Sequence, residues 1–242
     1  IFNVFVILGV CALIRPVPLT AGNIRRDIPF GVLASLLLLA LAMDSLFCKG
    51  AADRIGRIDG VVMIGLYVAL MWYTIRKTKR PEATAPAEGA KAPMAGWLMA
   101  VMIVGGLAGL VFGGEMFLRS ATAIARGRGI SEAVIALTLV AGGPSLPELA
   151  SSLVSLFKGK ADMALGNVIG SNIANILLIL GVSATINPLS MGGITVWDLL
   201  MVLLSSVVVF LAAFTFRRKA IDRWEGTIFV AIYVAYIWYL IR

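Results

Sequence analysis

The 242-residue sequence contains no histidine, and only 14% of its residues are charged. Without histidine, the chain has no imidazole to bind zinc, to serve a Ser-His triad or to relay protons. Its two cysteines, Cys11 and Cys48, lie in separate apolar runs and match neither a CxxC motif nor a disulfide framework. This scarcity of catalytic groups argues against an enzyme.

Apolar side chains take the place of charge: they make up 60% of the residues and give a mean hydropathy of +0.96. A soluble domain of this length needs more polar surface, so the excess must face hydrocarbon. Crossing a ~30 Å hydrocarbon layer takes about 20 residues, and the backbone there must be helical. The sequence therefore predicts an all-α polytopic membrane protein with eight spans in a lipid bilayer. They run at about 1–14, 28–48, 59–76, 95–118, 130–157, 164–186, 196–215 and 225–241.

The net charge of +8 comes from short basic clusters between the apolar segments. Such clusters are typical of loops that orient helices in a membrane, so no nucleic-acid partner is predicted. Residues 77–93, rich in Pro, Ala and charge, indicate a linker between two halves. If this linker is cytoplasmic, 14 of the 21 Lys and Arg residues lie on the inner side, as the positive-inside rule requires. The short linker favours a prokaryotic inner membrane.

The two halves of the chain resemble each other. Residues 1–16 (IFNVFVILGVCALIRP) align with residues 173–188 (IANILLILGVSATINP) at an offset of 172, with nine of the 16 positions identical. Residues 67–76 align with residues 233–242 at an offset of 166. Shared Asn, Gly, Trp and Arg argue against a chance match between apolar helices.

This alignment predicts an internal repeat of five-helix units. Residues 94–242 would form a complete second repeat, and residues 1–76 the last three helices of the first. An odd number of spans inverts the second copy relative to the first, as in many secondary transporters. We therefore expect an inverted-topology repeat in which eight of ten spans are present and two N-terminal helices are missing.

The first chemical motif is ALTLVAGGPSLPELASSL, residues 136–153. Its glycines and prolines predict a helix break between about Gly142 and Pro147, because proline removes a backbone donor and clashes with the preceding turn. The freed carbonyls, with Ser145, suit a hard cation. Glu148 follows deep in the span, where a carboxylate must be paired, protonated or bound to a cation. The alternative is a proline kink whose glutamate is hydrogen-bonded to a neighbouring helix.

The second motif is GNVIGSNIANILLILG, residues 166–181. Gly166 and Gly170 have the small-xxx-small spacing that allows another helix to approach closely. A stripe of amides and hydroxyls on one helix face favours a cation site, although a hydrogen-bonded packing seam is the alternative. The stripe consists of Asn167, Ser171, Asn172 and Asn175.

At these two motifs the chain resembles a known family. Pro-Ser-Leu-Pro-Glu followed by Gly-Asn-Val-Ile-Gly-Ser-Asn-Ile-Ala-Asn resembles the second alpha-repeat of the calcium/cation antiporter superfamily, which includes the bacterial sodium/calcium exchangers. IFNVFVILG resembles the tail of the first alpha-repeat. The resemblance covers essentially the whole chain. It implies ten helices in two inverted halves, with ions bound between the alpha-repeats.

The resemblance also implies the ligands. Glu148 would be the central carboxylate, and Ala141 would contribute its backbone carbonyl. Asn3 would be the first-repeat counterpart of Asn175, while Pro144 replaces a threonine that the family usually has, so one hydroxyl is lost. With one partner glutamate from the missing helices, two carboxylates would match one Ca²⁺. The implied side-chain ligands are Ser145, Ser171 and Asn175.

The function implied is secondary active antiport, exchanging Ca²⁺ for Na⁺ or H⁺ by alternating access. These ions are the transported species, and no cofactor is expected. The partners would be inorganic cations, the lipid bilayer and the missing N-terminal helices. The alternative is a non-transporting membrane scaffold or assembly subunit that has the same fold and an incomplete ion site.

Overall fold

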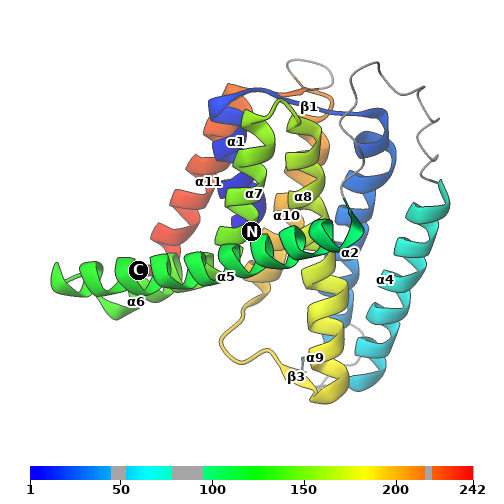
Figure 1. Cartoon of the computed structure of the whole chain (residues 1–242). Coiled ribbons are helices and arrows are strands. Elements are labelled where there is room, and N and C mark those ends of the chain that lie inside the picture. The colour runs from blue at the N-terminus through cyan, green and yellow to red at the C-terminus, as the bar shows by residue number, and fades with distance from the viewer. Residues whose placement is uncertain (45–52, 78–94, 216–219, 242) are drawn as a thin grey trace, which may run out of the picture.

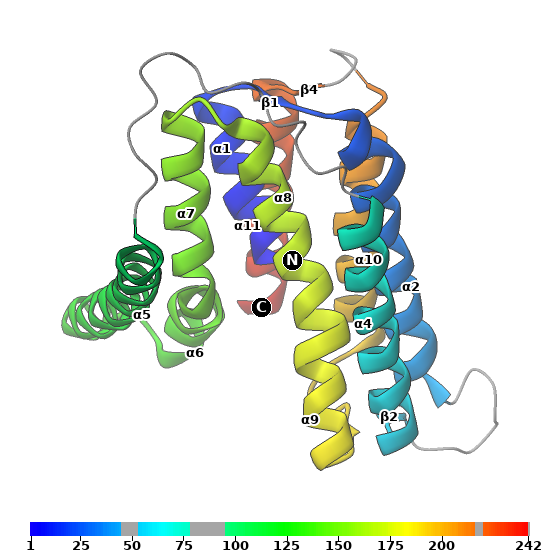
Figure 2. The same cartoon turned by 45° about the vertical axis from the view of Figure 1, so that its right-hand side comes forward.

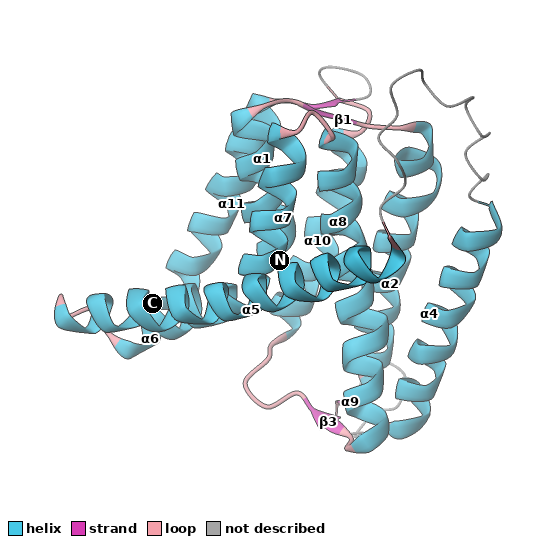
Figure 3. Ribbon diagram, viewed as in Figure 1, coloured by secondary structure: helices cyan, strands magenta, loops and turns pink. Residues whose placement is uncertain are grey.

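The computed structural model describes residues 1–44, 53–77, 95–215 and 220–241, which are almost entirely helical (Figure 3). The first half contains η1 (Asn3–Leu8), α1 (Gly9–Ile14), β1 (Val17–Pro18), η2 (Asn23–Asp27), α2 (Ile28–Ala42), β2 (Arg54–Ile55) and α4 (Arg57–Lys77). The second half contains α5 (Gly96–Gly127), α6 (Glu132–Ile135), η3 (Ala136–Val140), η4 (Gly143–Ser145), α7 (Leu146–Phe157), α8 (Ala161–Ile173), η5 (Ala174–Leu180), α9 (Gly181–Ile186), β3 (Leu189–Ser190), α10 (Val196–Ala212), β4 (Ala220–Ile221) and α11 (Arg223–Ile241).

Several of these helices are long and apolar enough to cross a membrane, which supports the predicted polytopic fold. They are Arg57–Lys77, Gly96–Gly127, Ala161–Ile186 and Arg223–Ile241. The helix boundaries that differ most from the prediction are the start of the α2 helix, already at residue 21, and the end of α5, at Gly127. The end of the predicted span 28–48, including Cys48, lies outside the described residues. Of the predicted linker 77–93, only Lys77 is described.

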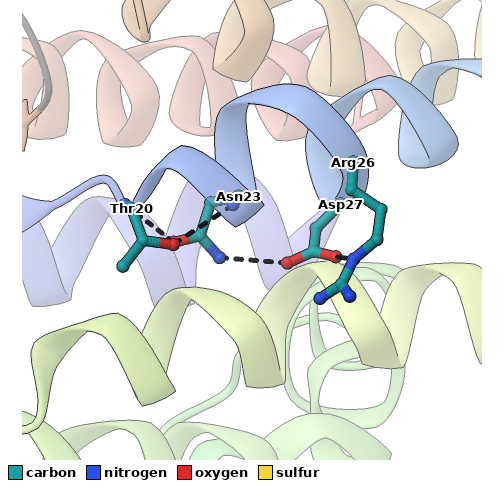
Figure 4. A network of polar contacts seen from close by, with 4 residues as sticks. All are labelled: Thr20, Asn23, Arg26 and Asp27. Carbon is teal, nitrogen blue, oxygen red and sulfur yellow. Dashed lines mark hydrogen bonds and ion pairs between the residues drawn. The ribbon is translucent and has the colours of Figure 1, made fainter. Parts of the chain in front are cut away.

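The early start of the α2 helix has a local cause (Figure 4). The backbone N–H of Thr20 donates to Asn23 Oδ1 at 3.0 Å, and the backbone N–H of Asn23 donates to Thr20 Oγ1 at 3.2 Å. This reciprocal pattern is a capping box, which satisfies donors at a helix start. Asn23 Nδ2 then donates to Asp27, which also accepts from Arg26. The polar turn therefore extends the helix beyond its apolar segment.

Helix α5 runs across the bundle rather than along it (Figures 1 and 3). Its 32 residues span about 48 Å at 1.5 Å each, more than a ~30 Å hydrocarbon layer needs. A helix of this length can span the layer with a tilt, and its inclination is set by its packing against neighbouring helices. Its apolar side chains, such as Trp97 and Phe112, are largely exposed.

The two short strand pairs lie at opposite ends of the bundle (Figures 1 and 2). β1 pairs antiparallel with β4, and β2 pairs antiparallel with β3. Val17 faces Ile221 in one pair, and Leu189 faces Ile55 in the other. Each pair joins a segment before the linker to one after it, so the two halves are tied together at both ends.

Close helix contacts occur at two glycine pairs. A Cβ on Gly9 would lie 3.2 Å from the carbonyl oxygen of Gly226, and one on Gly60 would lie 2.5 Å from that of Gly181. The close approach that Gly166 and Gly170 allow is not made by the described residues, where a Cβ at either glycine would meet no atom within 4 Å. Small-residue spacing permits a close contact, but the arrangement of the helices decides where one forms.

We expect Gly60→Ala to destabilise the protein. The added methyl group would lie 2.7 Å from Thr185 N as well as 2.5 Å from Gly181 O, and both are backbone atoms that cannot move aside. Overpacking of this kind lowers the free energy of unfolding by about 1–3 kcal/mol. Thermal melting in detergent measures the effect.

Gly65→Ala is the matched control on the same helix, because a Cβ at Gly65 meets no described atom within 4 Å. Alanine is the better helix former, so this variant should melt at the wild-type temperature or above it. Equal melting temperatures for the two variants would contradict the packing argument.

Candidate cation-binding site

The span with two prolines is broken, as predicted. The π-helical segment η3 is followed by the 3₁₀ turn η4 and then by α7. α6 lies beside α5, whereas α7 runs along the bundle (Figures 1 and 2). The break packs tightly: a Cβ on Gly142 would lie 2.7 Å from a ring carbon of Phe2, and one on Gly143 would lie 2.5 Å from Leu118 Cδ2. The glycines therefore allow the irregular backbone to be buried.

Glu148 lies in the first turn of α7, directly after the break. Its Oε2 is buried and has no hydrogen-bond partner among the described residues. The amide of Asn167 donates to the backbone carbonyl of Glu148 at 3.2 Å. A glutamate held by a neighbouring helix through Oε2 is therefore not observed within the described ranges. This oxygen is therefore available to a cation.

Asn3 is the second buried group with an unsatisfied oxygen. Its side chain is 4% exposed, and its Oδ1 lacks a partner in the described part of the chain. Asn3 begins the π-helical segment η1, and Asn175 lies in the π-helical segment η5. Ala141 directly follows a third such segment, η3. π-Helical turns are rare and often occur at functional sites.

A cavity of about 560 Å³ brings together most of the predicted ligand residues. It is lined by Asn3, Ala141, Ser145 and Asn175. Glu148 and Ser171 do not line it. Each lies about one helical turn from a residue that does, since Glu148 follows Ser145 by three positions and Ser171 precedes Asn175 by four.

The residues of the polar stripe on α8 and η5 make two kinds of contact. Asn167 Nδ2 donates to Ser151 Oγ and Ser152 Oγ, each at 2.9 Å, and these hydrogen bonds link α8 to α7. Ser171 donates its proton to the carbonyl of Asn167 at 2.7 Å. Asn172 and Asn175 line the cavity. The packing seam is therefore observed at one end of the motif, and the other end lines the cavity, where the cation site stays a prediction.

Some of the cavity wall was not assigned from the sequence. The unassigned polar residues are Ser35, Ser205, Ser206, Tyr233 and Tyr236. The serines are isolated polar residues within apolar spans, a signal that could have identified them. The hydroxyl of Tyr236 donates to Asp198 Oδ1 at 2.5 Å. Asp198 also completes the capping box of α10 with Thr195.

Comparison with known proteins identifies the family. The family model for "Sodium/calcium exchanger protein" matches residues 1–76 and 98–242. The chain belongs to the sodium/calcium exchanger family. This exchanger is 34% identical to the putative antiporter CaxA of Alkalimonas amylolytica, over 98% of its own length and 74% of CaxA. It is 32% identical to the inner membrane protein YrbG of Escherichia coli (strain K12), over 78% of its own length and 58% of YrbG.

Solved structures agree with this assignment. A structure of the sodium-calcium exchanger NCX_Mj matches with a TM-score of 0.77 and 29% identity, over 99% of this exchanger and 73% of NCX_Mj. The predicted family and the all-helical membrane fold are thus confirmed. Exchangers are transporters rather than enzymes, and the scaffold alternative is not favoured. The individual ion ligands stay predictions.

Proposed function

We propose that this exchanger is a secondary active antiporter that moves Ca²⁺ in exchange for Na⁺ or H⁺. The observation that carries the proposal is the pair of buried oxygens, Asn3 Oδ1 and Glu148 Oε2, without hydrogen-bond partners in the described ranges. Leaving one such group unsatisfied costs about 1–3 kcal/mol. A hard cation, whose ligands in proteins are oxygens, satisfies both.

The proposed ligand set combines one carboxylate with neutral oxygens. Glu148 supplies the charge, Ala141 its carbonyl and Asn3 its amide oxygen. No cluster of three or more Asp, Glu, Cys or His occurs among the described residues, and Glu148 is the one charged side chain that they contribute to the proposed set. A transport site must bind its ion weakly enough to release it, which suits few charged ligands. The side-chain ligands from the second motif and the break are Ser145, Ser171 and Asn175.

Exchange follows from competition for one carboxylate. Two cations that both need Glu148 repel each other at the short distances of one site, so each displaces the other. Alternating access would then expose the site to one side of the membrane at a time. Whether Na⁺ or H⁺ drives the cycle depends on which of them displaces Ca²⁺ from Glu148.

We also propose that the two halves form an inverted repeat. The offset of 172 found in the sequence relates α1 to α9 and β1 to β3, and the offset of 166 relates β2 to β4 and the start of α4 to that of α11. Adding 172 to the residue numbers of β1 gives β3, and subtracting 166 from those of β4 gives β2. The pair β1–β4 therefore corresponds to the pair β3–β2. By the same two offsets, the contact between Gly9 and Gly226 corresponds to the contact between Gly181 and Gly60.

The location proposed for this exchanger is a prokaryotic inner membrane, with residues 77–93 in the cytoplasm. The excess of Lys and Arg on the linker side supports the orientation. The name of the relative YrbG, an inner membrane protein, supports the compartment.

The test of antiport is ⁴⁵Ca²⁺ uptake by the full-length protein in proteoliposomes. An outward Na⁺ gradient is applied first, and an outward H⁺ gradient second. Uptake driven by either gradient establishes Ca²⁺ antiport and identifies the coupling ion. Absence of uptake with both gradients, from protein shown to be folded by its melting transition, would refute the assignment of Ca²⁺ as the transported ion.

A further inference from the structure

An apolar groove of about 440 Å³ lies between α2 and α4, which are neighbours in the bundle (Figures 1 and 2). Ligand pockets in proteins have volumes of about 300–1,000 Å³, so the groove is large enough for a ligand. Leu33 of α2 and Leu66 of α4 line it and are exposed. The groove is therefore open to the hydrocarbon around the bundle. It shares no lining residue with the central cavity.

A second apolar groove, of about 810 Å³, lies between α10 and α11. The two grooves are equivalent in the proposed repeat. The residues that α4 contributes to the first groove are Leu66, Ala69, Leu70 and Tyr73. Adding 166 to their numbers gives the residues that α11 contributes to the second, which are Ile232, Ala235, Tyr236 and Tyr239.

The second groove shows what can cover the first. In the part of the chain that the structure describes, only α10 and α11 line the second groove, and α5, α6 and α7 do not. In the proposed repeat, the helices expected before Ile1 correspond to α5–α7. By this equivalence they would leave the first groove uncovered as well, so lipid is its natural occupant.

Basic residues surround one end of the first groove. The rings of Phe30 and Tyr73 meet there edge to face, with centroids 6.1 Å apart. Arg26 lies about one turn before Phe30. Arg76 and Lys77 follow Tyr73 by three and four positions and so share its helix face, and Lys77 Nζ lies 5.8 Å from the centre of the Tyr73 ring. The basic rim of the groove consists of Arg25, Arg26, Arg76 and Lys77.

Most of the charge on the basic rim is not neutralised by the protein. Within the described ranges, Arg26 pairs with Asp27 at 2.7 Å, whereas the other three residues of the rim form no ion pair. The guanidinium carbon of Arg76 lies 3.9 Å over the ring of Trp72, an aromatic residue of the kind found at membrane interfaces. Basic clefts between helices on the cytoplasmic side of a membrane bind the headgroups of anionic lipids.

The equivalent end of the second groove has less positive charge. Ser35 and Ser206 are hydrogen-bonded and 171 positions apart, and this offset relates α2 to α10. At this offset the two arginines of η2 correspond to Val196 and Trp197, and α10 contains no Lys or Arg. Arg242 lies outside the described residues. Because the cytoplasmic leaflet carries the negative surface potential, the basic rim lies where the proposed orientation places anionic lipid.

We propose that the first groove and its basic rim bind one anionic phospholipid of the cytoplasmic leaflet. An acyl chain lies in the groove, where it makes dispersion contacts with the apolar lining. The phosphate lies at the rim, where arginine and lysine donate charge-assisted hydrogen bonds to its oxygens. This site goes beyond the proposed antiport, and only the choice of leaflet rests on the proposed orientation.

The test is native mass spectrometry of the purified full-length protein in detergent, titrated with phosphatidylglycerol or, separately, with phosphatidylcholine of the same acyl chains. One phosphatidylglycerol should bind at least about tenfold more tightly than phosphatidylcholine. Arg76→Gln/Lys77→Gln should weaken phosphatidylglycerol binding about 30-fold, because two basic residues near one anionic lipid are lost. Binding of phosphatidylcholine should stay unchanged.

Lys158→Gln/Lys160→Gln is the matched control for charge. It removes two exposed lysines from the same proposed side of the membrane, and neither lines the groove. Phosphatidylglycerol should bind to this variant as tightly as to the wild type. Glycerol 3-phosphate, which has the phosphate without acyl chains, should not bind measurably.

Ala69→Trp tests the groove without changing the charge. Tryptophan at this lining position occupies the space of the acyl chain and should weaken phosphatidylglycerol binding about tenfold or more. Ala235→Trp is the equivalent substitution in the second groove and should leave this binding unchanged. Melting curves without added lipid check that both variants are folded.

Equal affinities for the two lipids, or wild-type binding by Arg76→Gln/Lys77→Gln, would overturn the proposal. Tight binding of glycerol 3-phosphate would assign the rim to a soluble anion instead. An equal loss in Ala69→Trp and Ala235→Trp would show that the first groove is not the site. Because lipid binding is measured without ion flux, a failure of the proposed antiport leaves these results unaffected.

Discussion

Glu148→Gln should abolish cation exchange while leaving the protein folded. Glutamine has nearly the same shape but no charge, so the Ca²⁺ site loses the only carboxylate that the described residues provide in our proposed ligand set. The loss of a charged ligand is worth about 3 kcal/mol, which lowers Ca²⁺ affinity about 100-fold or more. The measurement is ⁴⁵Ca²⁺ flux in proteoliposomes at a fixed ion gradient.

The same variant should be more stable than the wild type when no cation is present. Glu148 Oε2 is buried without a partner in the described part of the chain, and an unpaired buried charge destabilises a fold. Its melting temperature without Ca²⁺ should therefore rise, and added Ca²⁺ should raise it no further.

The matched control is Glu132→Gln. Glu132 is an exposed carboxylate paired with Arg126 at 2.7 Å, and it does not line the cavity. A surface pair of this kind contributes little, so flux and Ca²⁺-dependent melting should stay at wild-type values. Wild-type flux in Glu148→Gln would remove Glu148 from the ion site.

Asn3→Leu should stabilise the cation-free protein and weaken Ca²⁺ binding. Leucine has the same number and branching of side-chain heavy atoms, and it removes the buried oxygen that has no partner in the described residues. Relief of this unsatisfied group is worth about 1–3 kcal/mol. Loss of one neutral ligand should lower Ca²⁺ affinity about tenfold, as one hydrogen bond to a charged species does. Melting curves with and without Ca²⁺ measure both effects.

Asn23→Leu provides a control with the opposite expected sign. Asn23 is also buried, at 6% exposure, but its side chain accepts from Thr20 and donates to Asp27. The same substitution therefore breaks satisfied hydrogen bonds and should lower the melting temperature without a specific loss of Ca²⁺ affinity. If Asn3→Leu destabilised the cation-free protein as Asn23→Leu does, the Asn3 oxygen would have a structural partner and no role as a ligand.

The helices, the break in one span and the family could be predicted from the sequence, because each depends on neighbouring residues. Long apolar segments in lipid must be helical, because no water is present to satisfy the backbone. The position of the break followed from two prolines and two glycines, and the structure places it where these residues predict. The family followed from the motifs around Glu148 and Asn175, and the family match confirms it.

The contacts between helices could not be predicted from the sequence. A span such as that of α2, which is apolar apart from Ser35, gives little sign of which face meets protein and which meets lipid, because both are mostly apolar. For this reason the spacing of Gly166 and Gly170 indicated a contact that the described residues do not make, while Gly60 and Gly181 make one.

The sequence by itself determined the membrane class, the helices, the broken span and the chemical character of the candidate ligands, since each depends on residues close together in the chain. Only the tertiary structure decided that Asn167 hydrogen-bonds to α7 while Asn175 lines the cavity. It also decided that Ser35 hydrogen-bonds to Ser206, 171 positions later in the chain. Whether a polar group is paired or left open depends on helices that are distant in sequence, and their packing fixes the answer.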